Sequence, residues 1–193
     1  PATIVYDHPE KILTCSTMTG THLAPKLRKL VDRTEHELFL VTPYFVPGEN
    51  GVALLAGARQ RGARVVVITN SLASTNSVSV HSGYRRYRRA LLEAGVELYE
   101  IKPTATSQRR RSGRGWFGSK GAGRSSGASL HAKAFAFDRR IGFVGSYNLD
   151  PRSSRLNTEM GVVVDCPELV QRLPEETELD LAHTAYRVEL DGR

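Results

Sequence analysis

The sequence has little cysteine and no long apolar run. Its two cysteines, Cys15 and Cys166, lie far apart and outside any metal-binding motif, so we expect no disulfide framework and a reducing compartment. No stretch approaches the ~18 consecutive apolar residues that a membrane-spanning helix needs, and the first residues do not show the charged-then-apolar pattern of a signal peptide. The sequence therefore excludes the class of small secreted domains that are held together by disulfides.

What is present indicates one basic domain. The chain has 193 residues, of which 40% are hydrophobic, enough to bury one substantial core in a single domain over residues 1–193. Its formal net charge of +7 favours an anionic partner, namely a phosphate ester, a lipid headgroup or nucleic acid. The chain begins at Pro1 and stops at Arg193 just after a strand-like segment, so we expect it to be part of a longer protein.

Apolar runs alternate with helical patterns along most of the chain. The expected strands are 37–45, 64–69, 96–101, 130–137, 141–145, 157–165 and 187–190, and the expected helices are 21–36, one through 53–56, 81–95 and one that begins at 167. This alternation predicts an α/β fold with a mixed sheet flanked by helices on both faces. Ligands of such sheets bind beyond the carboxyl ends of strands, where 42–44 and 70–71 are either rim residues of a site or ordinary loop residues.

The expected helix 81–95 carries four arginines on its outward side: Arg85, Arg86, Arg88 and Arg89. They form either a basic landing surface or an ordinary solvated face, and we favour the solvated face because charge runs on helices usually face water. His81 precedes this helix and is expected to cap or pack it rather than to act in a site.

A loop at 104–128 differs from the rest of the chain in composition. It is rich in Gly and Ser, carries six basic residues and no acidic one, and has one apolar pair, Trp116 and Phe117. Such a composition does not build a packed core. The loop suits an anionic membrane surface, at about 1 kcal/mol per basic residue near the surface, or a nucleic-acid backbone with Trp116 stacked on a base. A plain disordered insertion is the third interpretation.

The expected strand 130–137, which follows this loop, places His131 and Lys133 on one face because side chains in a strand repeat every two residues. A ring nitrogen and an ammonium group side by side form a site for an anion. Asp138 stands at an odd offset from His131 and opens a turn, so we expect it to act from the strand end or through a second layer of residues.

The next expected strand delivers two more polar side chains, Ser146 and Asn148, whose hydroxyl and amide groups donate hydrogen bonds to oxygens of an anion. Gly145 has no Cβ and lets the backbone approach a ligand closely. Because no Cys or carboxylate cluster stands at metal spacing, we expect phosphoryl chemistry without metal or cofactor. A neutral imidazole would attack phosphorus, and the neighbouring donors would stabilise the charge on its oxygens.

The pattern His131-x-Lys133-x4-Asp138, followed by Gly145-Ser-x-Asn148, resembles the signature of the phospholipase D superfamily. A single histidine on a strand is more often a packing or surface residue, but the combined fixed positions favour the functional interpretation. The segments 42–48, 69–71 and 80–84 resemble more narrowly the C-terminal half of bacterial cardiolipin synthase-like proteins, and the resemblance extends over 4–190.

The resemblance implies one phospholipase D-like half in which His131 forms or resolves a phosphohistidine and Glu159 orients it. It further implies that Lys133, Ser146 and Asn148 hold the phosphate while Asp138 supports the site. Family enzymes carry two such motifs, so the second would come from the rest of a parent chain or from a homodimer partner.

The implied function is phosphatidyl transfer of the cardiolipin synthase type, or phospholipase D hydrolysis, on anionic phospholipid. The chain would then lie peripherally on the cytoplasmic side of a bacterial membrane. Two alternatives remain open. One is a dimeric single-motif phosphodiesterase that cleaves nucleic acid, and the other is a catalytically incomplete module that binds anionic membranes through 104–128.

Overall fold

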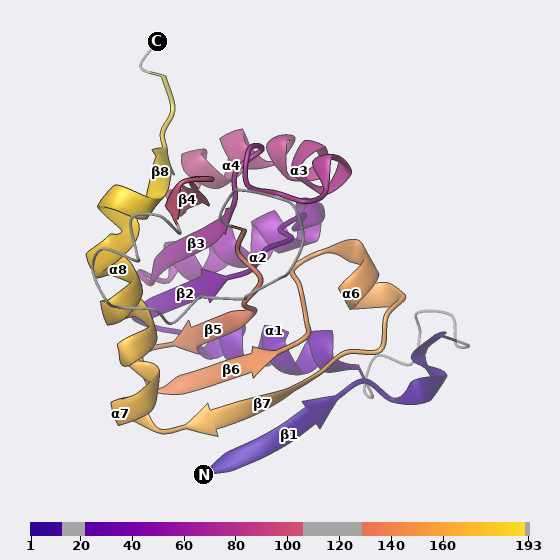
Figure 1. The fold of residues 1–193 in the computed structure, drawn as a ribbon. Coiled ribbons are helices and arrows are strands. Elements are labelled where there is room, and N and C mark those ends of the chain that lie inside the picture. Colours follow the sequence, from indigo (N-terminus) through magenta and orange to yellow (C-terminus); the bar gives the residue numbers. More distant parts are fainter. Residues whose placement is uncertain (13–21, 106–128, 192–193) are drawn as a thin grey trace.

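The structure, a computed structural model, describes residues 1–12, 22–105 and 129–191. Within these ranges the chain forms one eight-stranded sheet with the order β1-β7-β6-β5-β2-β3-β4-β8 (Figure 1). The strands are β1 (Ala2–Tyr6), β2 (Glu37–Val41), β3 (Arg64–Asn70), β4 (Glu97–Ile101), β5 (Ala134–Phe137), β6 (Ile141–Gly145), β7 (Met160–Asp165) and β8 (Ala185–Val188). Strands β2, β3 and β4 pair in parallel, and the other neighbours pair antiparallel. The predicted mixed α/β sheet is confirmed.

Helices cover both faces of the sheet. They are η1 (Pro9–Ile12), α1 (Leu23–Arg33), α2 (Gly48–Gln60), α3 (Val78–Arg85), α4 (Arg88–Glu93), α6 (Pro151–Arg155), α7 (Pro167–Val170) and α8 (Arg172–Thr184). Residues of α1, α2, α3 and α4 share one core cluster with one face of the sheet. Residues of α7 and α8 share a second cluster with the opposite face. All five residues of β2 are buried, as expected for a strand covered on both sides.

The predicted helix 81–95 is two helices, α3 and α4, and one of its arginines does not face outward. Arg88 lies over the ring of Tyr84, with its Cζ 5.0 Å from the ring centroid, and forms an ion pair with the buried carboxylate of Glu100. It also contacts the buried imidazole of His81 at 2.9 Å. Burial and the Arg88 charge lower the pKa of His81. Arg88 therefore joins α4 to β4 instead of forming a basic surface.

The strand predicted at 130–137 begins only at Ala134. Its partner β2 ends at Val41, which pairs with Ala134, so the residues before Ala134 have no β2 backbone to bind. They leave the sheet as an irregular segment. His131 and Lys133 consequently do not belong to a strand, and the period of two does not determine their directions.

A buried ion pair joins the start of the chain to the rest. The side chains of Asp7 and Lys11 are both fully buried, with 2.6 Å between Oδ2 and Nζ. Asp7 also accepts hydrogen bonds from the backbone N–H of Leu23 at 2.6 Å and of Glu159 at 2.9 Å. Lys11 donates to the carbonyl of Ser153 at 2.8 Å. One ion pair thus connects the β1–η1 segment to α1, α6 and the start of β7.

Replacing Asp7 with Ala should destabilise the protein strongly, because it leaves the Lys11 ammonium buried without its counter-ion. We expect a loss of about 3–5 kcal/mol in the free energy of unfolding, measured by urea denaturation followed by circular dichroism. Asp32→Ala is the control, since the Arg28–Asp32 pair is exposed and such pairs contribute about 0–1 kcal/mol. Equal effects of the two substitutions would contradict the importance of the buried pair.

Candidate active site

The segment that carries His131 and Lys133 lies beside the segment that carries Ser146 and Asn148. Because β5 and β6 are antiparallel, with Ala134 opposite Val144, the start of β5 adjoins the end of β6. The N–H of Gly145 donates to the carbonyl of Lys133 at 3.2 Å. The parallel strands β2 and β3 end at the same edge, where ligands of such sheets bind.

Glu159 is the buried acid of this edge. It stands just before β7, and its carboxylate accepts hydrogen bonds from the hydroxyls of Ser146 and Ser153 and from the amide of Asn157. Sequence reasoning singled out Ser146 but not Ser153, whose role is visible only once α6 packs against β7. Glu159 therefore contacts Ser146, one of the residues that the sequence predicts to bind phosphate.

Lys133 is half-buried, and burial lowers the pKa of its ammonium group below the ordinary value of 10.5. The charges of Glu159 and Asp150 act in the opposite direction. Its Nζ donates to the carbonyl of His131 at 3.0 Å. A partly desolvated ammonium interacts more strongly with an anion than one in bulk water, which is the property that a phosphate-binding lysine needs.

The side chain of His131 is exposed at the open side of the edge. Within the described ranges its imidazole has no hydrogen bond or ion pair, and the hydrogen bonds of Glu159 go to other groups. The expected contact between Glu159 and His131 is thus absent from this part of the structure. Among the residues that the structure describes, no side chain or backbone group occupies the ring nitrogens of this exposed imidazole.

Asn148 is buried, and its backbone N–H donates to the hydroxyl of Ser153 at 3.2 Å. Its Oδ1 is buried without a hydrogen-bond partner in the described part of the chain. Buried polar atoms are nearly always paired, so this oxygen is an exception among the described residues.

Gly145 lies where β6 and β7 approach each other closely. A Cβ at this position would stand 2.3 Å from the carbonyl oxygen of Met160 and 2.7 Å from the Cα of Gly161. The missing side chain lets β6 and β7 pair closely next to Ser146. The expected close approach of a ligand to Gly145 stays a prediction.

The structure does not bring Asp138 to His131. Asp138 follows the last residue of β5, at the far end of the strand, and accepts hydrogen bonds from the backbone N–H groups of residues 35, 36 and 37 at 3.1, 2.7 and 2.9 Å. Burial alone would raise the pKa of Asp138, but these three donors outweigh burial and hold the pKa below its ordinary 3.8. Its contacts fix the start of β2 against the end of β5.

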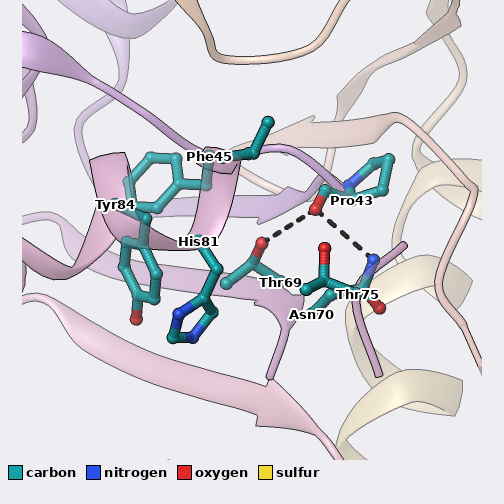
Figure 2. Close-up of a pocket in the computed structure, with 8 residues that line it drawn as sticks. Pro43, Phe45, Thr69, Asn70, Thr75, His81 and Tyr84 are labelled. Atoms are coloured by element: carbon teal, nitrogen blue, oxygen red, sulfur yellow. Dashed lines mark hydrogen bonds between the residues drawn. The ribbon is translucent and has the colours of Figure 1, made fainter. Parts of the chain in front are cut away.

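A small pocket lies beside the site, at the ends of β2 and β3 (Figure 2). It encloses about 10 Å³, room for about one water molecule. It is lined by Pro43, Phe45, Thr69, Asn70, Thr75, Val80, His81 and Tyr84. The predicted rim residue Asn70 is part of this wall. His81 also lines it, although its hydrogen bond goes to Arg88.

Some of the residues singled out in the sequence lie outside the part of the chain that the structure describes. Cys15 and all but the first two residues of the basic loop, 104–128, lie outside the described ranges. Among the residues that are described, no group of three or more His, Cys, Asp or Glu is placed to hold a metal ion. No helix in those ranges has both the length and the apolar character to cross a bilayer.

Comparison with known proteins identifies the family. Residues 27–181 match the family described as "Cardiolipin synthase, PLD-like domain", so the chain belongs to that family of phospholipase D-like proteins. It is 39% identical over 169 residues to cardiolipin synthase C of Escherichia coli, an alignment that covers 88% of this chain and 34% of the relative. It is also 30% identical over 172 residues to an uncharacterized protein of Helicobacter pylori, covering 89% and 32% of the two chains. The chain thus spans about a third of the length of these relatives.

Solved structures confirm the fold. Nuc of Salmonella typhimurium, a phospholipase D family member, matches with a TM-score of 0.65 and 14% identity over 98% of this chain and 99% of its own. Phosphatidylserine synthase of Haemophilus influenzae matches with a TM-score of 0.65 and 15% identity, over 97% of this chain and 40% of its own. At such identities the likeness shows the fold alone. The predicted phospholipase D-like architecture is confirmed.

Replacing Asp138 with Asn tests whether this residue supports the strand rather than the reaction. The amide keeps one acceptor oxygen and loses the charge, so we expect the free energy of unfolding to fall by about 1–2 kcal/mol. Activity per folded molecule should stay within about threefold, because the residue lies at the far end of β5. Stability and turnover are both measured on the same preparations of the full-length parent protein, wild type and variant.

The pH dependence of stability gives a second test of the role of Asp138. Because the folded pKa of Asp138 is depressed, its stabilising contribution is complete above the ordinary value of 3.8 and is lost as the pH falls through the lower folded value. The stability difference between wild type and Asp138→Asn should therefore shrink in acid. A large loss of turnover at unchanged stability would instead place Asp138 in the reaction.

Proposed function

We propose that this chain supplies one half of a phospholipase D-type active site that cleaves and re-forms phosphodiesters of phospholipids. The observation that carries the proposal is the meeting of two segments at one edge of the sheet, His131–Lys133 beside Ser146–Asn148. Membership of the cardiolipin synthase family supports a phospholipid as the substrate. Transfer to an alcohol gives a new phospholipid, and transfer to water gives hydrolysis.

In the first step a ring nitrogen of His131 attacks phosphorus. The bond from phosphorus to the leaving alcohol breaks, and a second histidine donates the proton that this alcohol needs. In the second step the acceptor gives its proton back to the second histidine and attacks the phosphohistidine, which frees His131. The ammonium of Lys133 and donors from Ser146 and Asn148 stabilise the negative charge on the phosphoryl oxygens.

We keep for Glu159 the role of orienting the histidine, which it takes up when Ser146 releases it. In this structure the Ser146 hydroxyl donates to Glu159. When a phosphate enters, the same hydroxyl can turn to a phosphoryl oxygen, which leaves a carboxylate oxygen of Glu159 free to accept an N–H from an imidazole. That hydrogen bond would fix the tautomer and stabilise the positive charge that forms on the ring.

The second histidine has to come from outside the described site. The relatives are about three times as long as the matched region, since this chain covers 34% of cardiolipin synthase C of E. coli, so we place the second half elsewhere in a longer parent chain. In that parent the chain would lie on the cytoplasmic side of the membrane, and the basic loop at 104–128 would attract anionic lipid.

A second candidate is a homodimeric phosphodiesterase acting on nucleic acid. The observation that favours it is chain length, because Nuc of S. typhimurium matches over 99% of its own chain. Two copies of this chain would then each contribute one His131. Sequence similarity extends to the named cardiolipin synthases well outside the histidine motif, which is why we rank the lipid reaction first.

The assignment is tested by cleavage of a chromogenic phosphodiester across a range of protein concentrations, with His131→Ala as the control. Under the first proposal the isolated chain supplies only one of the two catalytic histidines and is inactive. The full parent protein is active, and His131→Ala lowers its turnover by about 10³-fold or more, because removing a nucleophile removes the covalent route. Activity of the isolated chain that rises faster than its concentration and disappears in His131→Ala would establish the dimer. No activity of the parent protein on any diester would refute both.

The substrate class and the loop are tested together with vesicles of anionic phospholipid. We expect the chain to sediment with such vesicles and to lose most of its binding when the six basic residues of the loop are replaced by Gln, because each contributes about 1 kcal/mol near the surface. Binding without any lipid turnover by the parent protein would support the membrane-binding module. Preferred cleavage of single-stranded DNA over lipid would support the nuclease.

A further inference from the structure

The last residue of β3, Asn70, holds the backbone immediately before His131. Its side-chain Oδ1 accepts from the N–H of Leu130 at 2.8 Å, and its Nδ2 donates to the carbonyl of the same residue at 3.1 Å. Because β2 ends at Val41, it offers no backbone partner to Leu130. The side-chain amide of Asn70 instead binds both backbone groups of Leu130, as a neighbouring strand would. The amide of Asn70 therefore holds the backbone of Leu130, four positions before the start of β5, through both of its hydrogen-bonding groups.

The other hydrogen-bonding positions of Asn70 are also occupied. Its Oδ1 accepts from the hydroxyl of Ser74 at 3.2 Å. Its Nδ2 also donates to the carbonyl of Pro43 at 3.4 Å, a contact that Figure 2 shows. Asn70 is 3% exposed. These contacts fix the amide plane and assign its oxygen and nitrogen, so that Leu130 meets a rigid partner rather than a rotating one.

The short segment between Leu130 and β5 is fixed at both ends. Leu130 is tied to Asn70 and packs in the core cluster that includes Ile68 and Ala134. The carbonyl of His131 accepts from the ammonium of Lys133, and the carbonyl of Lys133 accepts from Gly145. The exposed imidazole of His131 has no side-chain partner in the described ranges, so its position depends on its backbone, and the backbone depends on Asn70.

We propose that Asn70 is a positioning residue that places His131 for attack on phosphorus. The proposal rests on the proposed function, since it assigns to His131 the role of nucleophile. A nucleophile must stand about 3–3.5 Å from the reacting atom in the correct direction, and a displacement of about 1 Å can cost 10²-fold in rate. Asn70 should accordingly affect turnover much more than substrate binding.

The test uses the full-length parent protein with Asn70→Ala, Asn70→Asp and the control Thr69→Val. Thr69 is the neighbouring residue of the same strand, is also buried, and donates to the carbonyl of Pro43 but not to Leu130. We expect Asn70→Ala to lower kcat by about 10–100-fold with KM changed less than threefold, and Thr69→Val to lower kcat less than threefold. Equal kcat losses in both variants, after correction for the folded fraction, would overturn the proposal.

Asn70→Asp separates positioning from general stability through its pH profile. The carboxylate keeps the acceptor for the Leu130 N–H but has no donor for the Leu130 carbonyl. Protonation restores an O–H donor, so the ratio of variant kcat to wild-type kcat should rise as the pH falls through the pKa of the introduced acid. A ratio that stays flat or falls as the pH falls would contradict a positioning role in which Asn70 holds Leu130 through both hydrogen bonds.

Hydrogen exchange of the Leu130 amide provides a readout that does not depend on activity. We expect its exchange to be at least about tenfold faster in Asn70→Ala than in wild type, as loss of one buried hydrogen bond of about 1.4 kcal/mol would give, with Thr69→Val close to wild type. An unchanged exchange rate of the Leu130 amide in Asn70→Ala would refute the restraint of Leu130 by Asn70. If the wild-type parent cleaves no phosphodiester, the proposed function fails. The exchange result then decides only whether Asn70 restrains the backbone of Leu130.

Discussion

The buried ion pair between Asp7 and Lys11 is the interaction on which much of this structure depends. A charge without water is costly unless every lone pair and proton is used, and here the carboxylate is shared between Lys11 and the backbone N–H groups of Leu23 and Glu159. One buried carboxylate thereby specifies where α1 begins and where β7 begins. Because Glu159 is one of its partners, the same pair also fixes the acid of the candidate site. The stability of the N-terminal segment and the geometry of the site are in this way coupled.

Charged side chains are paired differently at the two ends of the strands. At one end, ionic side chains are paired with each other: Arg64 and Arg139 both bind Glu37, and Arg64 also binds Glu97. At the other end, the ammonium of Lys133 is half-buried without a direct carboxylate partner among the described residues, and its pKa is lowered by burial. Unpaired positive charge at one edge, where strands end and the backbone is irregular, is what an anionic substrate requires. Pairing at the opposite edge keeps the rest of the sheet stable.

Much of the fold could be predicted from the sequence because the strands are short apolar runs with clear boundaries. The buried runs of β2 and β3 follow directly from hydropathy. The sequence predicts too early a start for β5, since the pattern at 130–133 alternates like a strand although β2 ends before it. The sequence also favours a solvent-exposed Arg88, because its ion pair with Glu100 joins residues of two elements and leaves no local pattern.

In the candidate site, too, the residues that local spacing reveals differ from those that only the folded chain reveals. His131, Lys133, Ser146 and Asn148 are recognisable because they lie in fixed short spacings, and the antiparallel pairing of β5 with β6 brings their segments together. For Asn70 the sequence predicts only a place at the end of a strand, on the rim of a site or in an ordinary loop. Its pairing with Leu130 spans 60 positions of sequence, and nothing in residue type predicts which backbone a buried amide will bind. In the proposed reaction His131 needs a mobile side chain to meet the substrate and a fixed backbone from which to attack. The hydrogen bonds of Asn70 place a restraint on the backbone one residue before this histidine, while its side chain is exposed.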